Sequence, residues 1–90
     1  MEPGSISIEF KPSVEKDLRR LPQSLLARVM RRLESLRAEP LPPQAAKIVG
    51  SEQLYRLRVG DYRVIYEFDR LERRVVVHYV RHRRAAYREL

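Results

Sequence analysis

An alternation of apolar and polar residues begins at Leu54, and it constrains the fold of this chain more than any other feature. Apolar residues recur at every second position both before and after the dipeptide Gly60-Asp61. A period of two indicates strands with one buried face, and a glycine-containing pair between two such runs is typical of a tight hairpin turn. We therefore predict an antiparallel hairpin over residues 54–68.

The turn also sets the register of this hairpin. With a loop of only two residues, the predicted pairs are Val59 with Tyr62, Arg58 with Arg63, Leu57 with Val64, and Arg56 with Ile65. Side chains directly opposite each other share a face of the sheet, so three arginines gather in one patch. Like charges in opposite positions cost up to about 1 kcal/mol, and an anion bound between them removes that cost.

Arginine suits an anion site because its planar guanidinium makes paired contacts with phosphate oxygens and keeps its charge. The hairpin therefore predicts a phosphate-binding face at Arg56, Arg58 and Arg63. The alternative is that these side chains extend into water or pair with Glu67 and Asp69.

The segments on either side of the hairpin supply the other elements of the fold. Residues 5–10 alternate as a half-buried strand does, and apolar spacings of three and four predict a short helix capped by Ser13 and a longer one with Pro22 in its first turn. A proline-rich connector then extends to about Gly50. Residues 75–80 are almost entirely apolar, which predicts a central strand buried on both faces.

Together these elements predict one α+β domain over residues 1–90, with a helical hairpin packed on a small antiparallel sheet. The 19 Lys and Arg residues outnumber the 12 Asp and Glu residues, and the net charge of +7 indicates a polyanion ligand. A solvated arginine-rich surface of the kind found on heat-tolerant proteins is the alternative. The chain has no cysteine, no apolar run long enough to span a membrane and no signal-peptide pattern, so we expect a cytoplasmic protein.

Metal-independent RNA cleavage is the reaction that best suits such an arginine face. It requires a proton acceptor for a 2′-hydroxyl, a proton donor for the leaving 5′-oxygen, and cations that stabilise the charge on the phosphate. The arginines supply the cations. His78 lies within the apolar run and is more consistent with a structural role, whereas His82 is equally consistent with either role. Tyr87, among basic residues, is placed to stack on a base or to pack the C-terminal segment onto the domain.

The sequence also resembles the RelE/ParE toxin superfamily along nearly its whole length. The resemblance rests on the run LYRLRVGDYRVIY from Leu54 to Tyr66, on VRHR from Val80 to Arg83, on Tyr87, and on the segment from Lys47 to Gly50. It implies a compact toxin of a type II toxin–antitoxin system with the order β-α-α-β-β-β and a curved sheet. RelE-like members cleave mRNA in the ribosomal A site by 2′-hydroxyl attack, without a cofactor, and leave a cyclic phosphate.

The resemblance also implies roles for individual residues. Arg56 and Arg58 match two basic strand residues, Arg63 a phosphate-stabilising arginine, Arg83 a late arginine, and Tyr87 a tyrosine that stacks on or orients the substrate. We expect further RNA contacts at Lys47, Arg81, His82 and Arg84. Some members have lysine in place of the strand arginines, and arginine is a poor base because its pKa exceeds about 12. The proton acceptor is therefore left open.

Two other departures concern the C-terminal end. Arg81 stands where a glycine is common, and only three residues follow Tyr87, so we expect the terminal helix to be short or absent. The implied partners are an acidic RelB-like antitoxin, the ribosome and mRNA, with operator DNA bound through the antitoxin and no membrane. The alternatives are a ParE-like toxin that traps DNA gyrase without cutting RNA, and a degenerate toxin that only binds its antitoxin.

Overall fold

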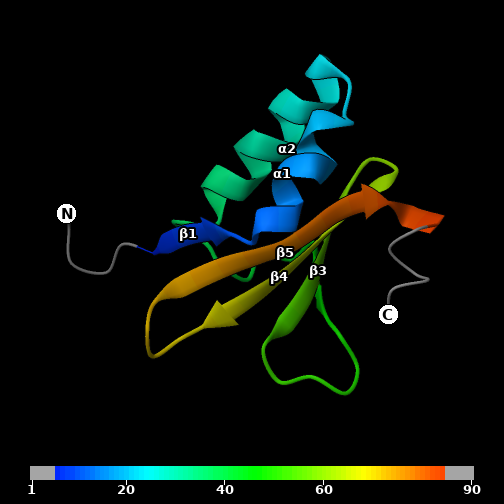
Figure 1. Cartoon of the computed structure of the whole chain (residues 1–90). Helices are drawn as coiled ribbons and strands as arrows, with labels where there is room; N and C mark the ends of the chain where they lie inside the picture. The colour runs from blue at the N-terminus through cyan, green and yellow to red at the C-terminus, as the bar shows by residue number, and fades with distance from the viewer. Residues whose placement is uncertain (1–5, 85–90) are drawn as a thin grey trace.

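Two helices pack on one face of a five-stranded sheet in the computed structural model, which describes residues 6–84 (Figure 1). The elements are β1 (Ser7–Phe10), α1 (Pro12–Arg19), α2 (Gln23–Ser35), β2 (Ala45–Lys47), β3 (Leu54–Val59), β4 (Tyr62–Asp69) and β5 (Arg74–His82). The predicted α+β class and the helical hairpin on the sheet are confirmed. The chain is helical at Arg83 and Arg84, and the expectation that the terminal helix is short or absent otherwise concerns residues outside the described range.

The sheet has the order β1-β5-β4-β3-β2, and its central strands form the antiparallel ladder that the alternation predicts. It differs from the prediction at both edges. β1 pairs with β5 in parallel, because the helical hairpin carries the chain back across the sheet before the next strands form. The proline-rich connector contains β2, which pairs with β3 and is too short, at three residues, to show a period in the sequence.

The β3–β4 hairpin has the predicted register, from Val59 opposite Tyr62 to Leu54 opposite Glu67. Gly60 has a φ of +58°, a left-handed conformation that glycine adopts without steric cost. The two-residue turn therefore holds the ladder in the one register that keeps the apolar side chains of both strands on the helix side.

Both helices begin at a residue other than the one the sequence predicts, α1 earlier and α2 one residue later. Lys11, and not Ser13, is the N-cap of α1, and Pro12 occupies the first turn, where its missing N–H costs nothing. Pro22 is likewise the N-cap of α2 and not a residue of its first turn. Both helices direct apolar residues at the sheet, and the core consists chiefly of Val14, Val29, Leu33, Leu36, Leu57, Val59, Val64, Tyr66, Val75, Val77 and Val80.

The strand that is buried on both faces is β4, and the prediction that this strand would be residues 75–80 was wrong. Four consecutive residues of β4, from Arg63 to Tyr66, are buried, whereas Val76 and His78 in β5 are partly exposed. The reason is lateral cover. Strands pair with β4 on both sides from Tyr62 to Glu67, but β1 pairs only with Arg74 to Val77 of β5.

Candidate functional site

A row of three arginines crosses the face of the sheet that lies opposite the helices. Arg58 of β3 lies opposite Arg63 of β4, and Arg63 lies opposite Arg81 of β5. Cβ atoms of directly opposed residues are about 5 Å apart, and their side chains share a face. We call Arg58, Arg63 and Arg81 the arginine row. The predicted pair is thus extended by a residue from a third strand.

A cavity of about 190 Å³ lies beside this row and is lined by Gln44, Ala46, Arg56, Arg58 and Arg63. We call it the arginine cavity. A water molecule occupies about 30 Å³ in the liquid, so the space is large enough for a phosphate group. The three residues predicted to bind phosphate are therefore brought together around one opening.

Arg63 is the most buried charged side chain of this cavity, with only 6% of its surface exposed. Its Nη1 donates to the carbonyl oxygens of Gly60 at 3.1 Å and Tyr62 at 2.9 Å. A guanidinium has five N–H donors, so Nε and Nη2 carry three more. The turn therefore holds a buried positive charge in a set orientation at the arginine cavity, where reduced solvent screening strengthens its field.

The residues from Arg81 to Arg83, at the end of β5 and just beyond it, are divided between the two faces and the end of the sheet. Arg81 is partly buried, with its Nε 3.7 Å from Oδ1 of Asp17 and its Cζ 4.6 Å from the centre of the Tyr79 ring. His82 lies opposite Tyr62 on the helix side, edge to face with it at 5.5 Å, so it does not face the arginine cavity. The backbone N–H of Arg83 donates to the carbonyl of Asp61 at 2.8 Å.

Two more predicted RNA contacts also lie away from the arginine cavity, and one predicted residue is outside the described range. Lys47 lies opposite Tyr55, on the other face of β2 from Ala46, whose partner Arg56 lines the cavity. Arg84 is exposed beyond β5. Tyr87 belongs to the part of the chain that the structure does not describe.

His78, in the middle of β5, contacts Glu67, with Nε2 and Oε1 3.2 Å apart.

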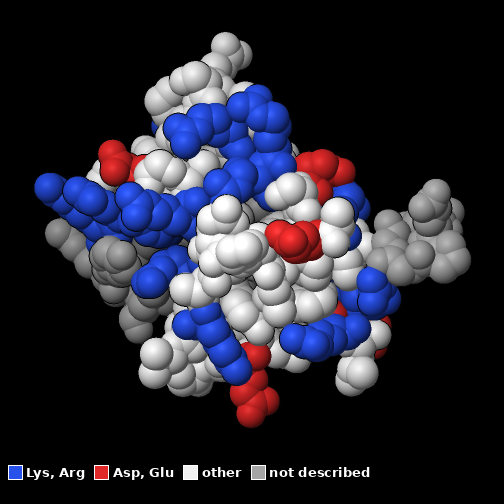
Figure 2. All heavy atoms as spheres, turned by 180° about the vertical axis from the view of Figure 1, so that it is seen from behind, with Lys and Arg blue, Asp and Glu red and all other residues white. Residues whose placement is uncertain are grey.

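Arg28 of α2 is a basic residue near the hairpin turn that the sequence did not single out. Its Nη1 lies 3.6 Å from where a Cβ on Gly60 would stand, so its guanidinium covers the turn from the helix side. Figure 2 shows Lys and Arg side chains in a broad band over one part of the surface, with Asp and Glu at scattered points. Only the folded chain brings this helix residue near the hairpin, so no local pattern could have identified it.

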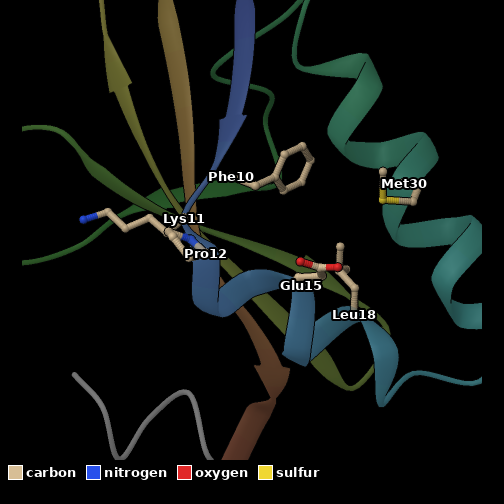
Figure 3. Close-up of a pocket in the computed structure, with 6 residues that line it drawn as sticks. All are labelled: Phe10, Lys11, Pro12, Glu15, Leu18 and Met30. Atoms are coloured by element: carbon tan, nitrogen blue, oxygen red, sulfur yellow. The ribbon is translucent and has the colours of Figure 1, made fainter.

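A second surface feature is an apolar groove between β1, α1 and α2. Its volume is about 300 Å³, and its lining consists of Phe10, Lys11, Pro12, Glu15, Leu18 and Met30. In Figure 3, Phe10 and Met30 point toward each other across the groove, and Lys11 points away from it. About 41% of Phe10 and 40% of Met30 is exposed. We call this feature the apolar groove.

Two classes of feature are not found in residues 6–84. No group of three or more His, Asp or Glu side chains is placed there to hold a metal ion. In the same residues, no helix has both the length and the apolar character needed to cross a membrane.

Comparison with known proteins identifies the family. The model of the family described as the ParE toxin of the type II toxin–antitoxin system parDE matches residues 8–87. A protein from Methanocaldococcus jannaschii that carries the name toxin RelE1 is 31% identical over 85 residues, which cover 91% of this chain and 94% of that protein.

Solved structures agree with this assignment. The RelE–RelB complex of Pyrococcus horikoshii OT3 contains a chain with 28% identity and a TM-score of 0.80, covering 88% of this chain and 96% of its own. The toxin–antitoxin complex RelBE2 of Mycobacterium tuberculosis gives 28% identity and a TM-score of 0.77, with coverage of 87% and 98%. The chain therefore belongs to the RelE/ParE superfamily and is a toxin of a type II toxin–antitoxin system.

Proposed function

We propose that this toxin is an endoribonuclease that cleaves mRNA in the ribosomal A site, in the cytoplasm, and thereby stops translation. The observation that carries the proposal is the arginine cavity, where three arginine side chains from two strands line one space of about 190 Å³. Attack on a phosphodiester builds negative charge on its oxygens, and preorganised cations stabilise that charge more in the transition state than in the ground state.

In the proposed reaction the 2′-oxygen bonds to phosphorus and the bond from phosphorus to the 5′-oxygen breaks. The products are a 2′,3′-cyclic phosphate and a 5′-hydroxyl end, and one proton passes from the 2′-hydroxyl to the leaving oxygen by way of the surroundings. Arg63 stabilises the phosphate charge, while Arg56 and Arg58 hold the same group from β3. No metal takes part in this scheme.

The remaining contacts extend along the RNA. We assign Arg83 to a neighbouring phosphate, since its backbone is bonded to the hairpin turn. By resemblance we assign Tyr87 to stacking on the substrate. Lys47, His82 and Arg84 do not face the arginine cavity, so their proposed contacts are with RNA outside the scissile nucleotide.

Sequencing of mRNA 5′-ends after induction tests this function. We expect new 5′-hydroxyl ends within translated reading frames at a constant position in the codon, and none when the antitoxin is co-expressed. Intact mRNA in cells whose growth has stopped would contradict the proposal.

A ParE-like action on DNA gyrase is the second candidate, and the matching family model, described as ParE, favours it. This reading predicts double-strand DNA breaks with intact mRNA after induction. The arginine cavity supports the first candidate, because a toxin that only traps a protein has no need of three arginines lining one cavity.

The partner that we propose is an acidic, RelB-like antitoxin, since both solved relatives were determined as toxin–antitoxin complexes. Its apolar side chains would cover the apolar groove, and its carboxylates would neutralise part of the +7 charge. A segment that folds on binding covers such separate surfaces well. We further propose that the complex binds operator DNA through the antitoxin.

A further inference from the structure

A β-bulge in β5 decides which face of the sheet Tyr79 occupies. Ile65 pairs with Tyr79 but the next residue, Tyr66, pairs with Val77, so one residue of β5, His78, has no counterpart in β4. Val77 points into the core, and strict alternation would send Tyr79 there as well. The bulge reverses the alternation, so that Val80 enters the core and Tyr79 lies with Ile65 on the face that carries the arginine row. We call this side of the sheet the arginine face.

The Tyr79 ring is held in a stack with a guanidinium from the arginine row. The Cζ atom of Arg81 lies 4.6 Å from the ring centre, and its Nε lies 3.7 Å from a carboxylate oxygen of Asp17 in α1. Asp17 is only 8% exposed, and its second oxygen accepts the backbone N–H of Val80 at 3.1 Å. A buried carboxylate thus lies within 4 Å of the guanidinium that covers the ring.

The Tyr79–Arg81 pair lies one strand away from Arg63 of the arginine cavity, and the side chain of Arg81 lines a separate pocket with Asp17 and Arg20. Arg81 lies directly opposite Arg63, one strand spacing of about 4.8 Å away, and Tyr79 lies opposite Ile65, the next residue on the same face. The charge of Arg81 is offset by Asp17, whereas the arginines that line the cavity come from β3 and β4. This face therefore combines a charged cavity with an aromatic–guanidinium pair whose charge is offset by Asp17.

We propose that Tyr79 and Arg81 form a stacking platform for one nucleobase, adjacent to the phosphate held in the arginine cavity. The inference rests on the proposed ribonuclease function and assigns a further binding residue, Tyr79, to that site. Bases stack on aromatic rings and on guanidinium planes irrespective of their hydrogen-bonding edges. Tyr79 is the residue that binds the base, and Asp17 is a positioning residue that acts through Arg81.

The test is single-turnover cleavage on purified ribosomes programmed with a defined mRNA. Each A-site nucleotide is replaced in turn by an abasic one, and the toxin is used as wild type, Tyr79→Phe and Tyr79→Leu. We expect one abasic position to slow the wild type about tenfold. Tyr79→Phe keeps the ring and behaves as the wild type. Tyr79→Leu is about tenfold slower on intact mRNA and loses sensitivity to that abasic position.

Asp17→Asn keeps an oxygen acceptor for Val80 but removes the charge beside Arg81, and we expect a partial loss at the same abasic position. An equal slowing of Tyr79→Leu on intact and abasic mRNA, or no slowing at all, would overturn the platform while leaving the ribonuclease function in place. Absence of cleavage by the wild type would overturn the ribonuclease function itself, and with it the platform.

Discussion

Arg63 joins a structural requirement to a functional one. Its guanidinium is buried against the carbonyl oxygens of its own turn, and a buried charge is stable only when it has such partners. The same side chain also lines the arginine cavity. A lysine has one ammonium group at the end of a flexible stem and lacks the planar fork needed to serve both sides.

We therefore expect Arg63→Lys to lower the single-turnover rate of RNA cleavage about 100-fold, as loss of one preorganised donor does elsewhere. Arg70→Lys is the matched control, because Arg70 is exposed in the turn at the opposite end of β4. Cleavage by Arg63→Lys at the wild-type rate would contradict the assigned role.

Tyr66 ties the connector to the sheet, because its hydroxyl donates to the carbonyl of Pro40 at 2.6 Å. Burial, and to a lesser degree the neighbouring Tyr55, raises the pKa of Tyr66 above its usual value of 10.0. In the unfolded chain the hydroxyl ionises near pH 10.0, whereas in the folded chain it keeps its proton. The resulting contribution to stability is complete below that pH and declines as the pH rises above it.

We expect Tyr66→Phe to lower the free energy of unfolding by about 1 kcal/mol at pH 7, through loss of the hydrogen bond. The variant should also lose less stability than the wild type between pH 10 and 11, because it lacks this ionisation. Urea denaturation across this pH range measures both effects. Parallel pH profiles for the two proteins would disprove the assignment.

At the scale of elements, the β3–β4 turn connects the two strands that line the arginine cavity. Gly60 has a φ of +58°, and a Cβ there would meet Arg28 only at an ordinary contact distance of 3.6 Å. The cost of a side chain at this position therefore comes from the backbone conformation and not from a clash.

We expect Gly60→Ala to destabilise the protein by about 1 kcal/mol. Gly60→Asn should cost less, because asparagine adopts the left-handed region more readily. Urea denaturation at neutral pH gives both values. If alanine and asparagine had equal effects, the cost would have to arise from contact with Arg28.

At the scale of the whole molecule, the arginine face and the apolar groove are separate surfaces, so catalysis and neutralisation by the antitoxin should be separable by mutation. Met30 is well exposed in the groove, and a charged residue there changes the docking surface while leaving the core intact.

We expect Met30→Glu to remain toxic and to bind the antitoxin at least about tenfold more weakly, because a carboxylate in an apolar contact loses its hydration without a partner. Leu71→Glu is the control, since Leu71 is 95% exposed in the β4–β5 turn. Growth rescue by co-expressed antitoxin and calorimetric titration measure the effect. Wild-type neutralisation of Met30→Glu would place the antitoxin elsewhere.

The sequence alone was sufficient to predict the hairpin, its register and the gathering of Arg56, Arg58 and Arg63. These features are local: a two-residue turn and a period of two determine which side chains lie opposite each other. The helical hairpin was predictable for the same reason, because apolar spacing within one helix determines the face it buries.

Only the tertiary structure decided the features that depend on residues far apart in the chain. The parallel pairing of β1 with β5, the cover that makes β4 and not β5 the buried strand, and the approach of Arg28 to the turn all follow from packing between distant segments. The bulge at His78 is the clearest case. One extra residue in β5 moves every side chain beyond the bulge to the opposite face of the sheet. No periodicity in the sequence predicts this bulge. Only the folded sheet therefore places Tyr79 beside the arginine row.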